Sequence, residues 1–157
     1  MLCGWTNMID EAVLNLHNVL KIPKEKIKYE NIPPMQIKYP VNKGNGKITT
    51  ERGDFVRSKS EKILADKLLL RNIPYSYECP LYIRNFGYLN PDFTVLNVNT
   101  RKELYWEHLG KMDDPEYSVN AILKMESYEQ NQIYPGSSLI LTYESLPHPF
   151  DSALLDG

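Results

Sequence analysis

Three acidic residues and one lysine suggest chemistry in this sequence of 157 residues. Glu61 ends the run SKSE, Asp92 lies within PDF, Glu107 begins EHLG, and Lys124 follows further along the chain. Carboxylate oxygens are the ligands that hard cations such as Mg²⁺ prefer, and a lysine supplies a mobile positive charge that can meet an anion. The four residues therefore predict a site that holds a divalent cation beside an anionic reaction centre.

Asp92 and Glu107 are predicted to face each other across a β-hairpin. The segments 91–98 and 102–109 have the composition of strands, and the connection between them is centred between Asn99 and Thr100. The two acids lie at equal distances from that centre, which makes them partners in an antiparallel pair. Opposed side chains on one face are about 5 Å apart, where like charges repel. A divalent cation held between the carboxylates would remove the repulsion.

Glu61 is predicted to lie on the apolar stripe of a helix over 56–71. Leu64, Ala65 and Leu68 follow it at helical spacing. A charge on a stripe that faces the core is rarely left unpaired. The alternative is an exposed glutamate in the first turn, where the helix dipole favours a negative charge.

The order and spacing of these motifs resemble the PD-(D/E)XK nuclease superfamily, in the variant that reads Glu-His-x-Gly and carries its lysine on the following helix. The resemblance extends from Arg57 to Glu144. It implies a restriction-endonuclease-like α/β core, a mixed β-sheet flanked by helices, and hydrolysis of phosphodiester bonds with Mg²⁺ (or Mn²⁺). The metal ligands that it implies are Asp92, Glu107, the Leu109 main-chain carbonyl and, through water, Glu61.

The lysine departs from the usual family pattern, in which it follows the motif glutamate by two residues. Leu109 occupies that place here. Lys124 is the candidate replacement, because it shares one helical face with Tyr117, Ala121 and Tyr128; a surface lysine is the alternative. Tyr128 would position Lys124 or contact a phosphate. His108 would contact metal-bound water, substrate phosphate or only its packing neighbours.

Helix caps and turn residues predict the rest of the organisation. An amphipathic helix over 7–21 and an irregular connection over 22–54, with a short extended piece near Ile48, form an N-terminal extension over 1–54. The core over 55–146 contains the helix over 56–71 and strands over 75–84, 91–98, 102–109 and 138–143. Its second helix starts at Asp114-Pro115 and runs to about residue 131. Residues 147–157 form a C-terminal tail.

Charge is unevenly distributed along the chain, although the net charge is only -2. Residues 21–59 hold ten lysines and arginines but four aspartates and glutamates. Such a basic arm beside an acidic body suits a protein that binds phosphates with one part and metal with another; a solvated, lysine-rich loop is the alternative. No apolar run approaches the about 20 residues of a membrane span, and no signal peptide is visible. We expect a cytoplasmic protein without a membrane partner.

The leading hypothesis from the sequence is a Mg²⁺-dependent nuclease that acts on nucleic acid, with DNA favoured over RNA. A homodimer, or a helicase or other domain in a longer parent protein, is compatible with it. One alternative is a catalytically inactive nucleic-acid-binding module that retains the nuclease fold, and it predicts that Lys124 points away from the carboxylates. Another is an unrelated α/β protein, which predicts that Glu61, Asp92 and Glu107 do not cluster.

Overall fold

The computed structural model describes residues 42–155, so the helix predicted over 7–21 lies outside the described residues. The elements begin with a hairpin of β1 (Ile48–Thr49) and β2 (Phe55–Val56), followed by helix α2 (Lys59–Leu70). Next come β3 (Tyr75–Tyr77), β4 (Leu81–Ile83), β5 (Gly87–Leu89), β6 (Phe93–Asn97) and β7 (Lys102–Leu109). Helix α3 (Pro115–Gln130), strand β8 (Leu139–Tyr143) and a short 3-10 helix, η3 (Ser152–Leu155), complete the order.

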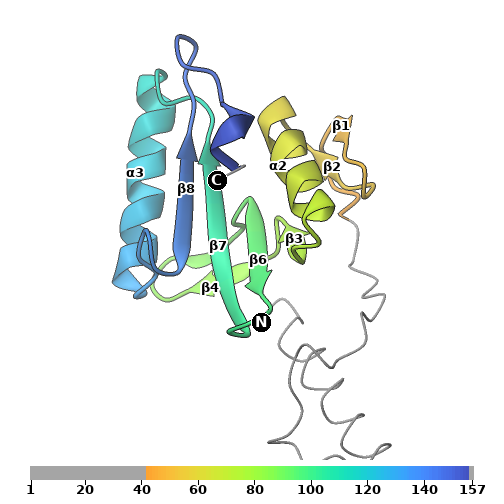
Figure 1. The fold of residues 1–157 in the computed structure, drawn as a ribbon. Helices are drawn as coiled ribbons and strands as arrows, with labels where there is room; N and C mark the ends of the chain where they lie inside the picture. Colours follow the sequence, from red (N-terminus) through yellow and green to blue (C-terminus); the bar gives the residue numbers. More distant parts are fainter. Residues whose placement is uncertain (1–41, 156–157) are drawn as a thin grey trace, which may run out of the picture.

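A four-stranded mixed sheet, in the order β3-β6-β7-β8, forms the centre of the fold. β6 is antiparallel to both of its neighbours, whereas β7 and β8 are parallel. Helix α3 makes the crossover between these two parallel strands, and α2 lies on the other side of the sheet from α3 (Figure 1). The predicted α/β architecture, a mixed sheet flanked by helices, is confirmed.

The register of the β6–β7 hairpin is the one predicted from its central turn. Phe93 pairs with Trp106, and the pairing continues to Asn97 and Lys102. Asp92 directly precedes β6, and continuing the same register by one residue sets it opposite Glu107. Helix α3 likewise begins with Asp114 as N-cap and Pro115 in its first turn, and Asn131 is its C-cap.

The prediction of one continuous strand over 75–84 is wrong, because the chain forms two short strands there, β3 and β4. Glu78 adopts a φ of 48° directly after β3, and this left-handed conformation ends an extended segment. β4 then pairs with β5 in a small separate hairpin, whose turn includes Asn85 with a φ of 65°. The predicted turn over 85–90 therefore contains strand β5.

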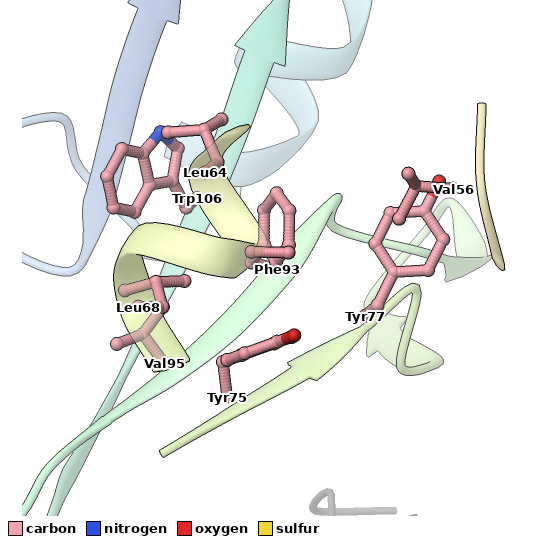
Figure 2. Packing of buried hydrophobic residues seen from close by; sticks show 9 residues of the cluster. Val56, Leu64, Leu68, Tyr75, Tyr77, Phe93, Val95 and Trp106 are labelled. Atoms are coloured by element: carbon pink, nitrogen blue, oxygen red, sulfur yellow. The ribbon is translucent and has the colours of Figure 1, made fainter. Parts of the chain in front are cut away.

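Apolar side chains alternate along β6 and β7 and build a core on each face of the sheet. On one face, Leu64 and Leu68 of α2 belong to the same buried cluster as Phe93, Val95 and Trp106 (Figure 2). The rings of Tyr75 and Tyr77 meet the Phe93 ring edge-on, with centroids 5.7 and 5.5 Å away. On the other face, Tyr128 of α3 packs with Ile83, Leu89 and Leu139. Helix α2 therefore packs against β6 and β7, and α3 packs against β4, β5 and β8.

A buried ion pair holds the β1–β2 hairpin against the sheet. Asp54 is fully buried and accepts hydrogen bonds from Arg52 Nε at 2.7 Å and Nη2 at 2.8 Å. The Tyr75 hydroxyl donates to the same carboxylate at 2.9 Å, and the Arg52 guanidinium lies over the Tyr75 ring. This hairpin spans the predicted boundary at residues 54 and 55, and the division into domains stays a prediction.

We expect Asp54→Asn to destabilise the fold by on the order of 3 kcal/mol, because the change removes the negative charge from a buried ion pair with Arg52. Urea unfolding at pH 7 measures the effect, with the exposed Asp113→Asn as the matched control. Burial, the largest single influence, would raise the pKa of Asp54, but the hydrogen bonds from Arg52, the Asn42 N–H and Tyr75, together with the Arg52 charge, hold that pKa below its usual range. The contribution of Asp54 is therefore present at neutral pH and is lost as the pH falls through this lowered pKa. Equal free energies of unfolding for the two variants would contradict the structural role.

Candidate active site

One cavity of about 480 Å³ brings the predicted residues together. It lies where the N-terminus of α2, the start of β6, the end of β7 and one face of α3 meet. Six of the seven predicted site residues line this cavity, and the seventh, Tyr128, forms a hydrogen bond with one of the six, Glu107. The lining residues are Arg57, Ser58, Glu61, Asp92, Glu107, His108, Leu109, Gly110, Lys111, Tyr117, Asn120, Ala121, Lys124 and Glu144.

Asp92 and Glu107 are buried acids that line this cavity, with 5% and 2% of their surface exposed. Each oxygen of Asp92 is already engaged. Oδ2 accepts a hydrogen bond of 2.8 Å from the main-chain N–H of His108, and Oδ1 lies 2.8 Å from Arg57 Nη2. These contacts fix the orientation of the Asp92 carboxylate beside β7.

Helix α3 supplies two side chains to Glu107. Lys124 Nζ lies 2.7 Å from the Glu107 carboxylate and 3.4 Å from the Asn90 carbonyl. Tyr128, which is completely buried one turn later, donates its hydroxyl to Glu107 at 2.5 Å. Lys124 thus points toward the carboxylates. Tyr128, which was predicted to position Lys124 or contact a phosphate, contacts Glu107.

Burial raises the pKa of both acids. For Glu107 the rise reaches about 7, opposed by the charge of Lys124 and increased by that of Asp92. For Asp92 burial is again the largest cause of the raised pKa, and the hydrogen bond from the His108 amide opposes it. Burial and the Glu107 charge also raise the pKa of Tyr128, which keeps this hydroxyl protonated as a donor. Both raised pKa values therefore favour the uptake of a proton or a cation by the paired carboxylates.

Glu61 is buried, so the alternative of an exposed glutamate is wrong. It is also the third residue of α2, where it forms a capping box with the N-cap Ser58. Its Oε2 accepts hydrogen bonds from the main-chain N–H groups of Arg57 and Ser58, at 2.7 and 3.2 Å, and from the Tyr77 hydroxyl at 2.8 Å. Glu61 therefore lies both on the apolar stripe of α2 and in its first turn, the two positions considered from the sequence.

Arg57 is a site residue that the sequence reasoning missed. A single nitrogen, Nη2, lies 2.8 Å from Asp92, 3.2 Å from Glu78 and 3.6 Å from Glu61. Only the contact with Glu61 joins neighbours in the sequence, since Asp92 is 35 residues away. The position of Arg57 just before the N-cap of α2 was the available signal, and it does not reveal the distant partners.

The His108 side chain occupies the face of β7 opposite the two acids, as the alternation of a regular strand predicts. Its Nδ1 lies 2.9 Å from Thr142 Oγ1, its Nε2 lies 3.3 Å from Glu144 Oε1, and its ring meets that of Phe150 edge-on. Glu144 in turn accepts a hydrogen bond of 2.8 Å from Ser60 Oγ. The imidazole therefore packs within a polar network that joins β7, β8 and α2, and Glu144 is a second residue that the sequence reasoning missed.

The Leu109 carbonyl, predicted as a metal ligand, accepts a hydrogen bond of 2.9 Å from the Glu144 N–H. It therefore points toward β8. Successive carbonyls of a strand point to opposite edges, so the His108 carbonyl is directed to the edge of β7 where β6 has not yet begun. That edge is also the one on which the His108 N–H meets Asp92.

The donor set suits a hard cation held by few protein ligands. No group of three or more histidines, cysteines, aspartates and glutamates within residues 42–155 is arranged to hold a metal ion. Mg²⁺, however, is commonly bound through one or two carboxylates while it keeps several waters. The opposed, buried Asp92 and Glu107 fit this mode, because a cation between them would offset the burial that raises both pKa values and the Asp92 charge that adds to the rise for Glu107.

Within the described part of the chain, no helix is long and apolar enough to span a membrane.

No family model matches the chain, and no curated protein matches it. Among solved structures, a cryo-electron microscopy structure of a DrdV–DNA complex is similar to it, with a TM-score of 0.36 and 16% sequence identity. The similarity covers 65% of this chain and 11% of the DrdV chain. A match at this score does not establish a shared family.

Proposed function

We propose that this protein is a metal-dependent nuclease that hydrolyses phosphodiester bonds of nucleic acid, with DNA as the expected substrate. One observation supports this more than any other. Lys124 Nζ lies 2.7 Å from Glu107 in the cavity that Asp92 also lines. Two buried acids can hold the ion that assists cleavage of a phosphodiester, and a lysine beside them can meet the negative charge that develops on the phosphate.

Asp92 and Glu107 would hold Mg²⁺ or Mn²⁺, with water in the remaining coordination positions. We infer the His108 carbonyl as the main-chain ligand in place of the Leu109 carbonyl, because the latter already accepts a hydrogen bond from β8. When bound, such an ion lowers the pKa of a coordinated water and stabilises the leaving oxygen. Glu61 is expected to act on this ion through water. Its Oε2 already accepts three hydrogen bonds, and its Oε1 lies 3.6 Å from Arg57 Nη2.

The residues around the acids prepare them for this role. The His108 N–H and the Tyr128 hydroxyl each hold one carboxylate in a fixed orientation, at 2.8 and 2.5 Å. Lys124 favours the ionised form of Glu107, and its positive charge is available to the negative charge that develops on the phosphate during attack. Because these groups are in place before substrate binds, little reorganisation is needed at the moment of reaction.

The inactive binding module remains the alternative function, and the orientation of Lys124 favours the active enzyme over it. An unrelated α/β protein is disfavoured by the common cavity of Glu61, Asp92 and Glu107. The expected homodimer and the helicase or other domain of a parent protein remain predictions, as does the cytoplasmic location.

Cleavage of supercoiled plasmid and of single-stranded DNA, with Mg²⁺ or Mn²⁺, tests the proposal. We expect Asp92→Asn to lower the cleavage rate by at least about 100-fold, because the neutral amide weakens metal binding, whereas its oxygen can still accept the His108 hydrogen bond. Asp113→Asn, an exposed acid outside this cavity, is the matched control and should cleave at the wild-type rate. Wild-type cleavage by Asp92→Asn, with its fold verified by circular dichroism, would exclude the proposed site.

A further inference from the structure

The Arg57 guanidinium lies against Asp92, one of the two carboxylates proposed to hold the cation. Its Nη2 lies within 4 Å of Asp92, Glu78 and Glu61, and the shortest of these distances, 2.8 Å, is to Asp92 Oδ1. The other oxygen of Asp92 is bonded to the His108 N–H. An ion that approaches Asp92 Oδ1 would therefore meet the positive charge of the Arg57 guanidinium at the same oxygen.

The exposure of these side chains makes the displacement feasible. Those of Asp92 and Glu61 are 7% and 8% exposed, whereas that of Arg57 is 58% exposed. The acids are thus fixed inside the fold, and the arginine reaches them from the solvent side. An arginine that swings outward regains water, but buried carboxylates that lose their partner do not.

We propose that Arg57 is an exchangeable counter-ion, which neutralises the acids while no metal is bound and leaves Asp92 when a divalent cation enters. The proposal rests on the metal site of the proposed function. It assigns Arg57 a positioning role that depends on metal. Without metal the guanidinium neutralises the carboxylates, and it competes with the ion for Asp92 Oδ1. We therefore expect binding of the ion to break the Arg57–Asp92 contact.

Metal affinity measured without nucleic acid tests the exchange. In titrations of the purified full chain with Mn²⁺, followed by calorimetry, we expect Arg57→Gln to bind at least about fivefold more tightly than wild type, since a coupling of this kind typically reaches that size. In the absence of metal the same variant should melt at a lower temperature, and Mn²⁺ should raise its melting temperature more than it raises that of wild type.

Two control variants separate exchange from a general effect of charge. Lys111 lines the same cavity, so Lys111→Gln removes one positive charge near the site without removing the contact with Asp92. Arg84→Gln removes an exposed arginine from the β4–β5 turn. Both should leave the Mn²⁺ affinity within about twofold of wild type, because neither charge touches the acid. An affinity gain in Lys111→Gln equal to that in Arg57→Gln would overturn the proposal.

Nuclear magnetic resonance of the wild-type protein provides a test that does not depend on a variant's stability. The guanidinium protons of Arg57, assigned by their loss in Arg57→Gln, should show restricted rotation without metal and faster rotation at saturating Mg²⁺. Unchanged rotation would overturn the exchange and leave the nuclease proposal intact. Failure of the wild type to bind Mn²⁺, or equal binding by wild type and Asp92→Asn, would instead refute the metal site itself.

Discussion

Lys124→Met is expected to reduce DNA cleavage by at least about 100-fold while the protein still binds Mn²⁺, since loss of one group that stabilises developing charge typically costs 10²–10³ in rate. Methionine keeps most of the apolar stem of lysine and removes the charge that lies 2.7 Å from Glu107. Single-turnover cleavage with saturating metal measures the chemical step, and calorimetric titration with Mn²⁺ measures binding. Loss of the rate without loss of the metal would assign Lys124 to the reaction itself.

Lys102→Met is the matched control for this prediction. Lys102 is an exposed lysine at the start of β7, and it pairs with Asn97 at the end of the hairpin remote from Glu107. Its replacement should leave the rate of cleavage unchanged. If Lys124→Met cleaves as fast as Lys102→Met, the helix lysine has no part in catalysis.

Without metal, the protein is expected to become less stable as the pH rises from about 5 to 8. Burial raises the pKa of Glu107 to about 7, so between its ordinary value and this one the folded state binds more protons than the unfolded state. Stability from this group is therefore complete below its unfolded pKa and is lost as the pH rises through about 7. The loss for Glu107 alone is on the order of 3 kcal/mol, and the raised pKa of Asp92 acts in the same direction.

Urea unfolding in the presence of a chelator, at pH 5 and pH 8, measures this slope. Glu107→Gln should reduce the dependence of the free energy of unfolding on pH, because the amide does not titrate. Subtracting the free energy of the variant from that of wild type at each pH removes the contributions of other groups. Adding Mg²⁺ at pH 8 should restore stability to the wild type and have little effect on Glu107→Gln. A wild-type protein that gains stability over this range, relative to Glu107→Gln, would contradict a raised pKa for Glu107.

The parts of the site that lie close in sequence were predictable. The pairing of Asp92 with Glu107 follows from the centre of one short turn, and the observed register continues to that pair. Helix α3 follows from Asp114 and Pro115, whose cap and ring favour a helix start whatever the surroundings. In both cases the information lies within a few residues of the feature.

The parts that depend on distant partners were not predictable. Arg57 meets Asp92 across 35 residues, and Ser60 meets Glu144 across 84. Neither helical periodicity nor a helix cap indicates such contacts, because they form only when α2 packs beside the start of β6 and the end of β8. The break after β3 was missed for a different reason, since Glu78 has no marked preference for its left-handed conformation.

Placing the lysine on α3 changes what determines its position. A lysine on β7 would be set by strand register, where a slip of one residue sends a side chain to the opposite face. Lys124 is set by the rotation of a helix whose buried residues, Ala121 and Tyr128, are anchored against the sheet. The number of residues between β7 and α3 can therefore vary without moving the lysine from Glu107. Proteins that share this arrangement need not share its spacing, and a search based on a fixed interval between glutamate and lysine would overlook them.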